Sequence, residues 1–210
     1  MIISIQHKFI FIKNRKVGGS SFEKYLIDKL VNKKTDIHTG TSTNEYSSNN
    51  INRKDGGGVS GHMSIIDISK ILNTKIDNLL SNFYIFSIER NPFDKCVSSY
   101  YFSRKKDEGF LSYLNSSKNI PMDWSKYTVN NNIIGTVYRY ENFSVVFQDL
   151  NYFLNLKSDK ILTLDEFNLY NLKSTHRPKG ETYKTQYNDE TIKFVKEHFK
   201  NEIIKFGYEF

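Results

Sequence analysis

The stretch FIFIKNRKVGGSSFEKYL, residues 9–26, passes from an apolar segment through two glycines and two serines into a segment with a helical apolar period. The aromatic and β-branched run within residues 8–13 is typical of a strand that is buried on both faces. After the serines, Phe22, Leu26 and Leu30 recur at the spacing of one helix face. The sequence therefore predicts a strand, a glycine-rich turn and a helix, which together open a β-α-β unit.

Two later segments repeat this alternation of strand and helix. Residues 83–88, FYIFSI, predict a second buried strand, and the following residues turn into a helix with Pro92 in its first turn. Residues 133–140 predict a third strand, and residues 141–156 have a helical apolar period. This order favours the α/β class, and we expect a three-layer sandwich with helices on both sides of a central parallel sheet.

The remaining segments are more polar. Residues 35–60 are rich in Asn, Ser, Thr and Gly, and we interpret them as a mobile surface loop. Residues 163–188 also look loop-like, and Asn188 is expected to cap one last helix whose apolar stripe includes Phe199. A chain of 210 residues has the length of one large domain, so we expect residues 1–210 to form a single domain.

The overall charge is basic. A formal net charge of +7 and a pI of about 9.2 suit an anionic ligand such as a nucleotide, an acidic glycan, a nucleic acid or a membrane surface. Biased base composition would produce the same excess of lysine. The basic residues are dispersed and no recognised nucleic-acid-binding module is present, which disfavours a nucleic-acid partner.

Cys96 is the single cysteine, so an intrachain disulfide is impossible and a reducing compartment is expected. The first residues lack the charged, apolar and small-residue regions of a secretory signal. No apolar run approaches the 18 residues or so of a membrane span. These features predict a cytoplasmic protein without a transmembrane segment.

The glycine-rich turn is a candidate anion site. Free backbone amides and the helix dipole both favour an anion at a helix N-terminus, and glycine allows its close approach. The motif is not a Walker A loop, because its lysine precedes the glycines. The alternative is an ordinary β-α turn with an exposed lysine. The candidate binding residues are Lys16, Val17, Gly18, Gly19, Ser20 and Ser21.

A second candidate follows the strand at residues 83–88. Ligands bind at the carboxyl ends of strands in α/β sheets, so Arg90 is expected at the same edge as the Lys16 loop. Ser98 lies about two turns into the following helix. A planar arginine fork and a hydroxyl could hold one phosphate between them.

These two motifs resemble those of the sulfotransferases that use 3′-phosphoadenosine 5′-phosphosulfate (PAPS). RKVGGSS is similar to their PKTGGTS loop for the 5′-phosphosulfate, with Arg15 in place of proline and Val17 in place of threonine. Residues 90–100 resemble their 3′-phosphate motif, RNPYDRxVSxY. Residues 135–156 and 187–210 are similar to segments of the Golgi-type glycan sulfotransferases, although the membrane anchor of those relatives is not expected here.

The resemblance implies a P-loop-like fold and in-line transfer of a sulfuryl group from PAPS to a hydroxyl, with a saccharide as the expected acceptor class and without a metal. Lys16 would lie near the bridging oxygen, and the amides of residues 17–21 would hold the 5′-phosphate. Arg90 and Ser98 would bind the 3′-phosphate of PAPS and of its product PAP. His62, in a Gly-His segment after the first helix, would be the general base.

A late basic segment resembles the Lys/Arg-Gly loop that closes over the nucleotide in that family. Its candidate residues are Arg177, Lys179 and Gly180. An ordinary solvated loop is the alternative for this segment.

Several residues have competing interpretations. His62 could instead be a packed or solvated histidine, and Glu23 is a weaker candidate base that could pair with Lys24 and neighbouring charges. Trp124 and Tyr127 could line an acceptor site or belong to the core. The other candidates, expected to be structural or solvated, are His7, His38 and His198.

Two other functions remain open. A P-loop-type kinase of a small molecule would require ATP and Mg²⁺, and the missing GK[ST] order counts against it. A non-catalytic module would bind nucleotides or polyanions without turnover. No metal-ligand spacing such as HExxH is present. The acceptor and the oligomeric state are not encoded in any recognisable motif.

Overall fold

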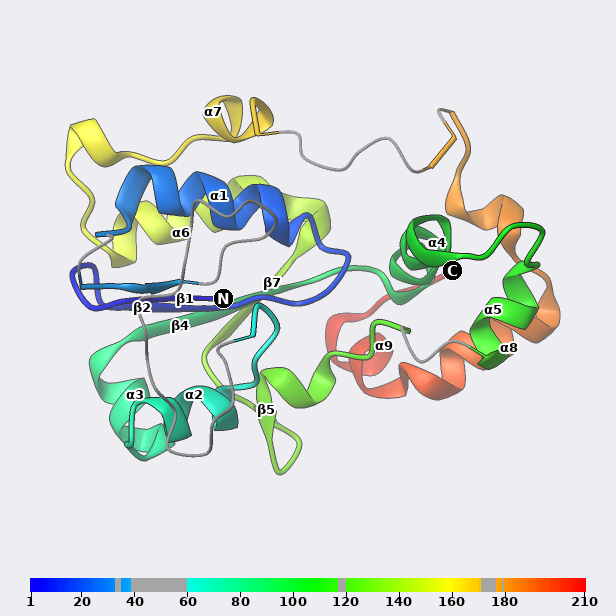
Figure 1. Cartoon of the computed structure of the whole chain (residues 1–210), viewed down its shortest axis with the longest axis horizontal. Coiled ribbons are helices and arrows are strands. Elements are labelled where there is room, and N and C mark those ends of the chain that lie inside the picture. The colour runs from blue at the N-terminus through cyan, green and yellow to red at the C-terminus, as the bar shows by residue number, and fades with distance from the viewer. Residues whose placement is uncertain (33–34, 39–59, 117–119, 171–176, 179) are drawn as a thin grey trace.

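The computed structural model describes residues 1–32, 35–38, 60–116, 120–170, 177–178 and 180–210. A central sheet is flanked by helices on both faces, as expected for the α/β class (Figure 1). The first face is covered by α1 (Gly19–Leu30) and α6 (Phe143–Phe153), and the second by α2 (Ile65–Ile71) and α3 (Ile76–Asn82).

The sheet is mixed, so the prediction of a parallel sheet is only partly correct. Its strands are β1 (Ile2–Ser4), β2 (Phe9–Ile12), β3 (Ile37–His38), β4 (Tyr84–Glu89) and β7 (Thr136–Arg139). The order is β3-β1-β2-β4-β7; β2, β4 and β7 are parallel, whereas β1 is antiparallel to β2 and β3. The link from β1 to β2 spans only residues 5–8, and such a short connection forces an antiparallel hairpin.

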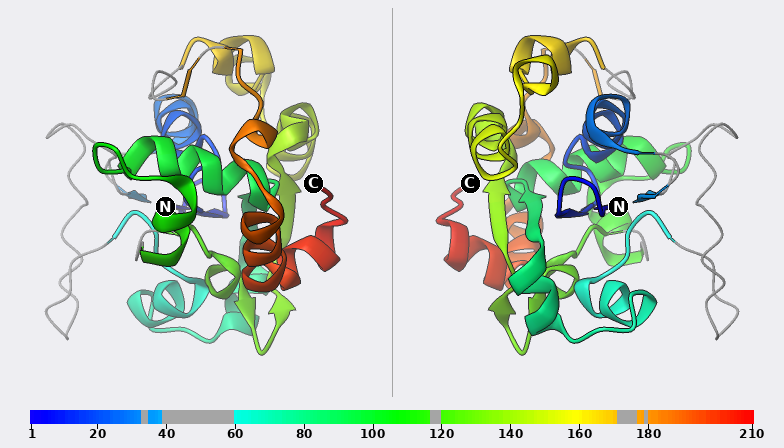
Figure 2. Two further views of the ribbon diagram at one scale, coloured as in Figure 1. Left: turned by 90° about the vertical axis from the view of Figure 1, so that its right-hand side faces the viewer. Right: turned by 90° about the vertical axis from the view of Figure 1, so that its left-hand side faces the viewer.

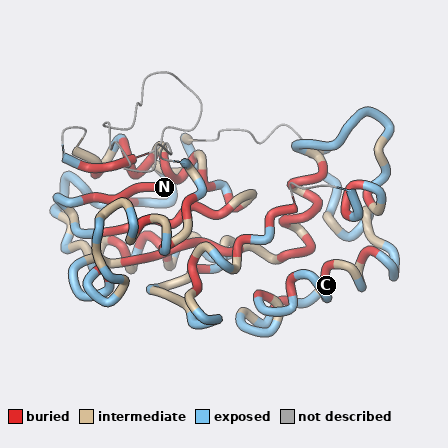
Figure 3. The backbone as a smooth tube through the Cα atoms, turned by 60° about the horizontal axis from the view of Figure 1, so that its bottom comes forward, coloured by how far each residue is buried: buried red, intermediate tan, exposed pale blue. Residues whose placement is uncertain are grey.

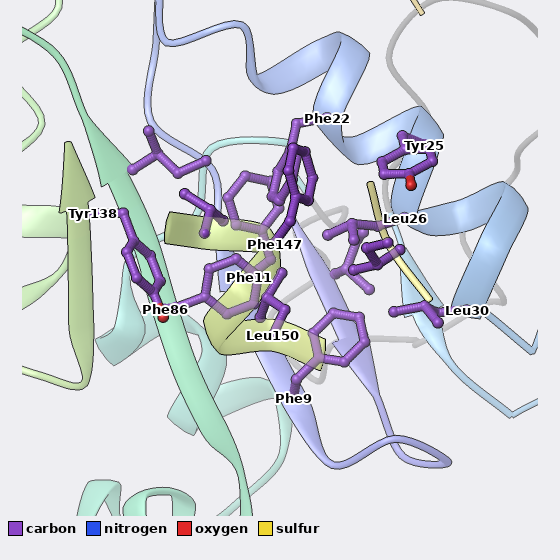
Figure 4. Packing of buried hydrophobic residues seen from close by; sticks show 14 of the residues in the cluster. Phe9, Phe11, Phe22, Tyr25, Leu26, Leu30, Phe86, Tyr138, Phe147 and Leu150 are labelled. Atoms are coloured by element: carbon purple, nitrogen blue, oxygen red, sulfur yellow. The ribbon is translucent and has the colours of Figure 1, made fainter. Parts of the chain in front are cut away.

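The core follows the alternation of side chains along the strands. Phe9 and Phe11 of β2 pack on the first face against α1 and α6, whereas Ile10 and Ile12 pack on the second face with α2 and α3. Stacked and edge-on aromatic rings fill the first face, and the ring centres of Phe11 and Phe86 are 5.2 Å apart (Figure 4). A strand that is buried on both faces therefore holds the glycine-rich turn at a fixed position.

A group of helices lies beside the end of the sheet where β4 leads into the next helix (Figures 1 and 2). It comprises α4 (Pro92–Ser103), α5 (Phe110–Ser116), α8 (Asp189–His198) and α9 (Lys200–Phe206). Buried positions run through the strands and along the inner sides of these helices (Figure 3). Within the described residues, no helix has the length and apolar character needed to cross a bilayer.

The predicted strand at residues 133–140 is interrupted. β5 (Thr128–Val129) pairs with β6 (Asn132–Ile133) in a separate hairpin, and β7 begins only at Thr136. Gly135 separates β6 from β7 with a φ of +80°, a left-handed conformation that breaks a continuous strand.

Three further predictions need correction. A short helix, α7 (Leu164–Asn168), forms where a loop was expected, because the Thr163 side chain caps it by accepting from the Glu166 amide. The last helix is two helices, α8 and α9, which are separated at the buried Phe199. The predicted loop at residues 35–60 contains the edge strand β3, and residues 39–59 lie outside the described residues. The Asn188 cap is confirmed.

Short 3₁₀ turns complete the description. They span Trp124–Lys126, Tyr140–Asn142, Ser158–Lys160 and Tyr183–Gln186. The first two matter for the site. Asp123, directly before the first turn, bonds to Arg15, and Tyr140 of the second lines the cleft described below.

Candidate anion-binding site

The turn between β2 and α1 presents a helix N-terminus without a side-chain cap. Gly18 is the N-cap residue, with a φ of +67°, and no side-chain cap bond forms there. The first turn of α1 also lacks acidic residues. Because the first amides of a helix have no intrahelical acceptor and lie at the positive end of its dipole, this end suits an anion.

Glycine is required at the two positions of the turn for different structural reasons. Gly18 requires its left-handed φ, and a β-carbon there would lie 3.3 Å from the Tyr140 ring. A β-carbon on Gly19 would lie 3.0 Å from Cγ of Lys13, so this glycine admits the buried Lys13 side chain. The second glycine therefore serves packing beneath the turn, whereas the first shapes the turn itself.

Glu23 lies beneath the turn in an ion pair. Its Oε2 accepts from Nζ of Lys13 at 2.8 Å, and its Oε1 accepts from the amino group of Met1. The side chain is fully buried and does not line the cleft described below. Lys24 forms an ion pair with Asp28 on the surface of α1, at 3.0 Å. This environment does not favour Glu23 as a base.

The two sequence motifs make direct contact at the carboxyl ends of the neighbouring strands β2 and β4. One terminal nitrogen of Arg90 donates to the carbonyl oxygen of Lys16 at 3.0 Å, across 74 residues of sequence. The guanidinium also lies 4.4 Å from the centre of the Tyr140 ring, a cation–π contact. The placement of Arg90 beside the Lys16 loop is as predicted.

Asp94 binds two arginines at once. Its Oδ2 accepts from Nε and a terminal nitrogen of Arg90, at 3.1 and 2.6 Å. Its Oδ1 accepts from a terminal nitrogen of Arg177 at 2.7 Å. Arg177 therefore lies beside Arg90, although the two are far apart in the sequence.

A cleft of about 950 Å³ opens over these groups. Val17 has its side chain in the core, Gly180 does not line the cleft, and Lys179 lies outside the described residues. The predicted site residues that line the cleft are Lys16, Gly18, Gly19, Ser20, Ser21, His62, Arg90, Ser98 and Arg177.

His62 faces the cleft with a defined tautomer. Its Nδ1 lies 3.0 Å from the carbonyl oxygen of Lys13. A carbonyl can only accept, so Nδ1 carries the proton and Nε2 keeps a free lone pair. Loss of hydration lowers the pKa of His62 to about 4, with a further contribution from the charge of Lys126, while the Lys13 carbonyl opposes the shift. The imidazole is therefore neutral at pH 7.

Arg15, which replaces the proline of the resembling motif, anchors the turn. Its amide and its Nε donate to the buried carboxylate of Asp123, at 2.8 and 3.0 Å. Asp123 also pairs with Lys95 and Lys126. Burial alone would raise the pKa of Asp123, but these cations outweigh it and lower the pKa well below its usual range. The carboxylate therefore stays ionised and holds the turn.

A second buried carboxylate, Glu89, extends this network to the end of β4. It accepts from Nζ of Lys95 at 2.6 Å and from the Tyr127 hydroxyl at 3.0 Å. Tyr127 is fully buried, and neither it nor Trp124 lines the cleft, so Tyr127 belongs to the core rather than to an acceptor wall.

The remaining histidines do not line the cleft. His38 is buried in β3, and His198 stacks on Phe194 with ring centres 3.8 Å apart. Burial lowers the pKa of His7, which lies near the opposite ends of the strands.

Sequence reasoning missed several residues of the site. Nζ of Lys16 lies 3.9 Å from the centre of the Phe102 ring, on the α4 side of the cleft. The opposite side is aromatic and comes partly from α7, which the polar composition of its segment concealed. Asp94 lies inside the quoted motif, but only the structure reveals its second arginine. The unforeseen aromatic and apolar lining residues are Tyr101, Phe102, Tyr140, Phe143, Leu164, Phe167 and Tyr170.

Comparisons with known proteins do not assign a family to the chain. No model of a known protein family matches it, and no curated protein sequence matches it significantly. The two motifs and the geometry of the cleft are therefore the features that indicate a function.

Proposed function

We propose that this protein is a sulfotransferase that transfers a sulfuryl group from PAPS to an acceptor hydroxyl, with a saccharide as the expected acceptor class. The observation that carries the proposal is the hydrogen bond from Arg90 to the Lys16 carbonyl. It joins, in one cleft, the two motifs that resemble the 5′-phosphosulfate and 3′-phosphate motifs of that family. A cytoplasmic location, expected from the single cysteine, belongs to the same proposal.

The donor groups of the cleft fit a ligand with two anionic ends. The amides at the start of α1 and the ammonium of Lys16 would hold the phosphosulfate. Arg90, Ser98 and Arg177 would hold the 3′-phosphate. Nε of Arg177 is buried and has no hydrogen-bond partner among the residues that the structure describes. A buried donor of this kind is costly unless a ligand or water satisfies it.

PAPS would supply an activated sulfuryl group. His62 would accept the acceptor proton at Nε2, the free nitrogen, while the acceptor oxygen bonds to sulfur and the bond from sulfur to the phosphate oxygen breaks. Lys16 and the helix amides would stabilise the negative charge that the leaving phosphate gains. The products would be a sulfate ester, PAP and the proton on His62, with no change in oxidation state.

The first test compares thermal unfolding with PAP, AMP, ATP and Mg-ATP at matched concentrations. PAP at about 100 times its dissociation constant should add about 2.7 kcal/mol to the free energy of unfolding. We expect PAP to stabilise the protein much more than AMP, because only PAP carries the 3′-phosphate. A larger shift with Mg-ATP would favour the kinase, and PAP binding without turnover on any saccharide would favour the binding module.

A further inference from the structure

Asp94 is a half-buried carboxylate beside the cleft, and it contacts two of the arginines that line the cleft, Arg90 and Arg177. Its two oxygens are both occupied, Oδ2 by Arg90 and Oδ1 by Arg177. An acidic group at an anion site would normally oppose ligand binding. Here the carboxylate is neutralised by two guanidinium groups, so we ask what its contacts contribute to the site.

The geometry explains what that contribution is. Without a shared carboxylate, the like charges of Arg90 and Arg177 would repel each other. Asp94 takes one N–H from Arg177 and two from Arg90, and the Lys16 carbonyl takes one more from Arg90. A guanidinium has five N–H donors, so each arginine keeps donors for a ligand. These include the buried Nε of Arg177.

The same carboxylate also ties together distant parts of the chain. Arg90 follows β4, Asp94 lies in the first turn of α4, and Arg177 comes 83 residues later. Among the described residues, Arg177 has no other hydrogen bond or ion pair to the sheet or to α4, whereas Arg90 also donates to the Lys16 carbonyl. The position of Arg177 in the cleft therefore depends on Asp94.

We propose that Asp94 is a positioning residue that holds Arg90 and Arg177 side by side as one binding site for the 3′-phosphate, and that it thereby sets the preference for PAP over AMP. This inference rests on the proposed function. Asp94 does not touch the reacting atoms; it acts through the two arginines.

The test replaces Asp94 by the isosteric asparagine and measures the affinities of PAP and AMP by calorimetry. Asp28→Asn is the matched control, because Asp28 forms an i,i+4 ion pair with Lys24 on the surface of α1 and does not itself line the cleft. We expect Asp94→Asn to lower the ratio of PAP affinity to AMP affinity at least tenfold, with AMP affinity nearly unchanged. Asp28→Asn should leave the ratio at its wild-type value.

Two results would overturn the inference. An unchanged ratio in Asp94→Asn would mean that the carboxylate only supports the fold, and a higher PAP affinity would mean that its charge merely opposes the phosphate. If Asp94→Asn does not fold, Asp94→Glu keeps the charge but moves it by one methylene, and the same fall in the ratio is expected.

The design separates this inference from the proposed function. If the wild-type protein shows no preference for PAP over AMP, the proposed donor fails. The arginine pair is then tested with inorganic pyrophosphate as the probe. A loss of pyrophosphate affinity in Asp94→Asn, but not in Asp28→Asn, would still support the positioning role, and equal affinity would refute it.

Discussion

At the scale of single residues, the hydrogen bond between His62 and the Lys13 carbonyl decides which imidazole nitrogen is available. The carbonyl belongs to the turn that also carries Lys16, so the candidate base and the candidate phosphate site are placed by one segment. This link lies outside the reach of sequence reasoning. The sequence offered His62 as a candidate through its Gly-His context, but not the contact that orients it.

Replacement of His62 by alanine should keep PAP binding and lower kcat by about 10² to 10⁴, the usual contribution of a general base. Calorimetry with PAP and a transfer assay measure the two effects separately. Full turnover in His62→Ala would place the base elsewhere. A matched control is His198→Ala, which removes an imidazole that does not line the cleft.

The lowered pKa of His62 also predicts a pH profile. A base must be unprotonated, and the pKa of this imidazole lies near 4 rather than 6.5 because the ring loses hydration. The acidic limb of kcat/KM should therefore lie below about pH 5, and the profile should be flat from there to pH 7. An acidic limb centred at 6.5 or above would show that an ordinary histidine, or another group, is the base.

Arg90 belongs to the second motif and donates a hydrogen bond to Lys16 of the first motif. Arg90→Ala should weaken PAP binding by about tenfold to a hundredfold or more, since a hydrogen bond to a charged group contributes about 1.5–3 kcal/mol. Arg104→Ala is the control, because Arg104 lies just after α4 and does not line the cleft. Unchanged affinity in Arg90→Ala would refute the 3′-phosphate assignment.

At the scale of elements, the segments that the sequence predicted well have a strong apolar pattern and are bounded by residues that favour a turn or a helix start. β2, β4, α1 and the start of α4 at Pro92 combine apolar strands with turn or helix-start residues, and all are confirmed. The missed elements are short. β1, β3 and α7 have two to five residues, too few for a period. β1 and β3 also depend on pairing with other strands.

Gly135 illustrates an element boundary with a strict steric requirement. A β-carbon there would lie 2.2 Å from the carbonyl oxygen of Ile85 on the neighbouring strand, and φ is +80°. We expect Gly135→Ala to lower the free energy of unfolding by about 4 kcal/mol or more, in the exceptional range for one substitution. Chemical denaturation of the purified variants measures this loss.

Gly180→Ala distinguishes the steric clash expected at Gly135 from the cost of a left-handed backbone conformation. Gly180 has nearly the same φ, +83°, but a β-carbon there would meet no described atom within 4 Å. Only the conformational cost should appear, about 1–2 kcal/mol. Equal losses in the two variants would mean that the close approach of β4 and β7 at this point is not rigid.

At the scale of the whole molecule, buried charges connect the sheet to the C-terminal helices. Glu89 and Asp123 share Lys95, and Glu202 of α9 lies close enough to be affected by Glu89. Burial, together with that neighbouring charge, raises the pKa of Glu202 to about 7. The folded protein therefore holds a proton on Glu202 that the unfolded chain releases near its ordinary pKa.

This difference gives stability a pH dependence. Between the ordinary pKa and about 7, the folded state binds more protons at Glu202 than the unfolded state does, so its contribution to stability falls as pH rises through this window. Glu202→Gln removes the charge. We expect it to raise Tm by a few degrees at pH 8 and to have little effect at pH 4.5. Thermal unfolding at the two pH values is the measurement.

The control for this prediction is Glu197→Gln. Glu197 lies exposed on α8, with Lys193 4.0 Å away, and its removal should shift Tm little at either pH. A Glu202→Gln variant that is equally or less stable at pH 8 would contradict the assignment of a costly buried charge at this position.

The sequence predicted which residues lie in the candidate site better than it predicted the hydrogen bonds and ion pairs between them. The two motifs identify Lys16, Arg90 and Ser98, because glycine-rich turns and strand ends have local signatures. Asp94 holding Arg177, and Asp123 holding Arg15, are pairings between segments more than 80 residues apart. Such pairings have no local pattern, so only the folded chain reveals them.

The register of β2 against β4 has a consequence for ligand size. Ile12, the last residue of β2, stands opposite Ser87, and β4 ends two residues later at Glu89, so the two motif loops leave the sheet from adjacent strands. Neighbouring strands are about 4.8 Å apart, and this spacing is fixed by backbone hydrogen bonds rather than by side chains. The distance between the two anion-binding ends is thus built into the backbone. For the proposed sulfotransferase, substitutions on the cleft walls would change which acceptor enters, while the span between the two charged groups of the donor would stay constant.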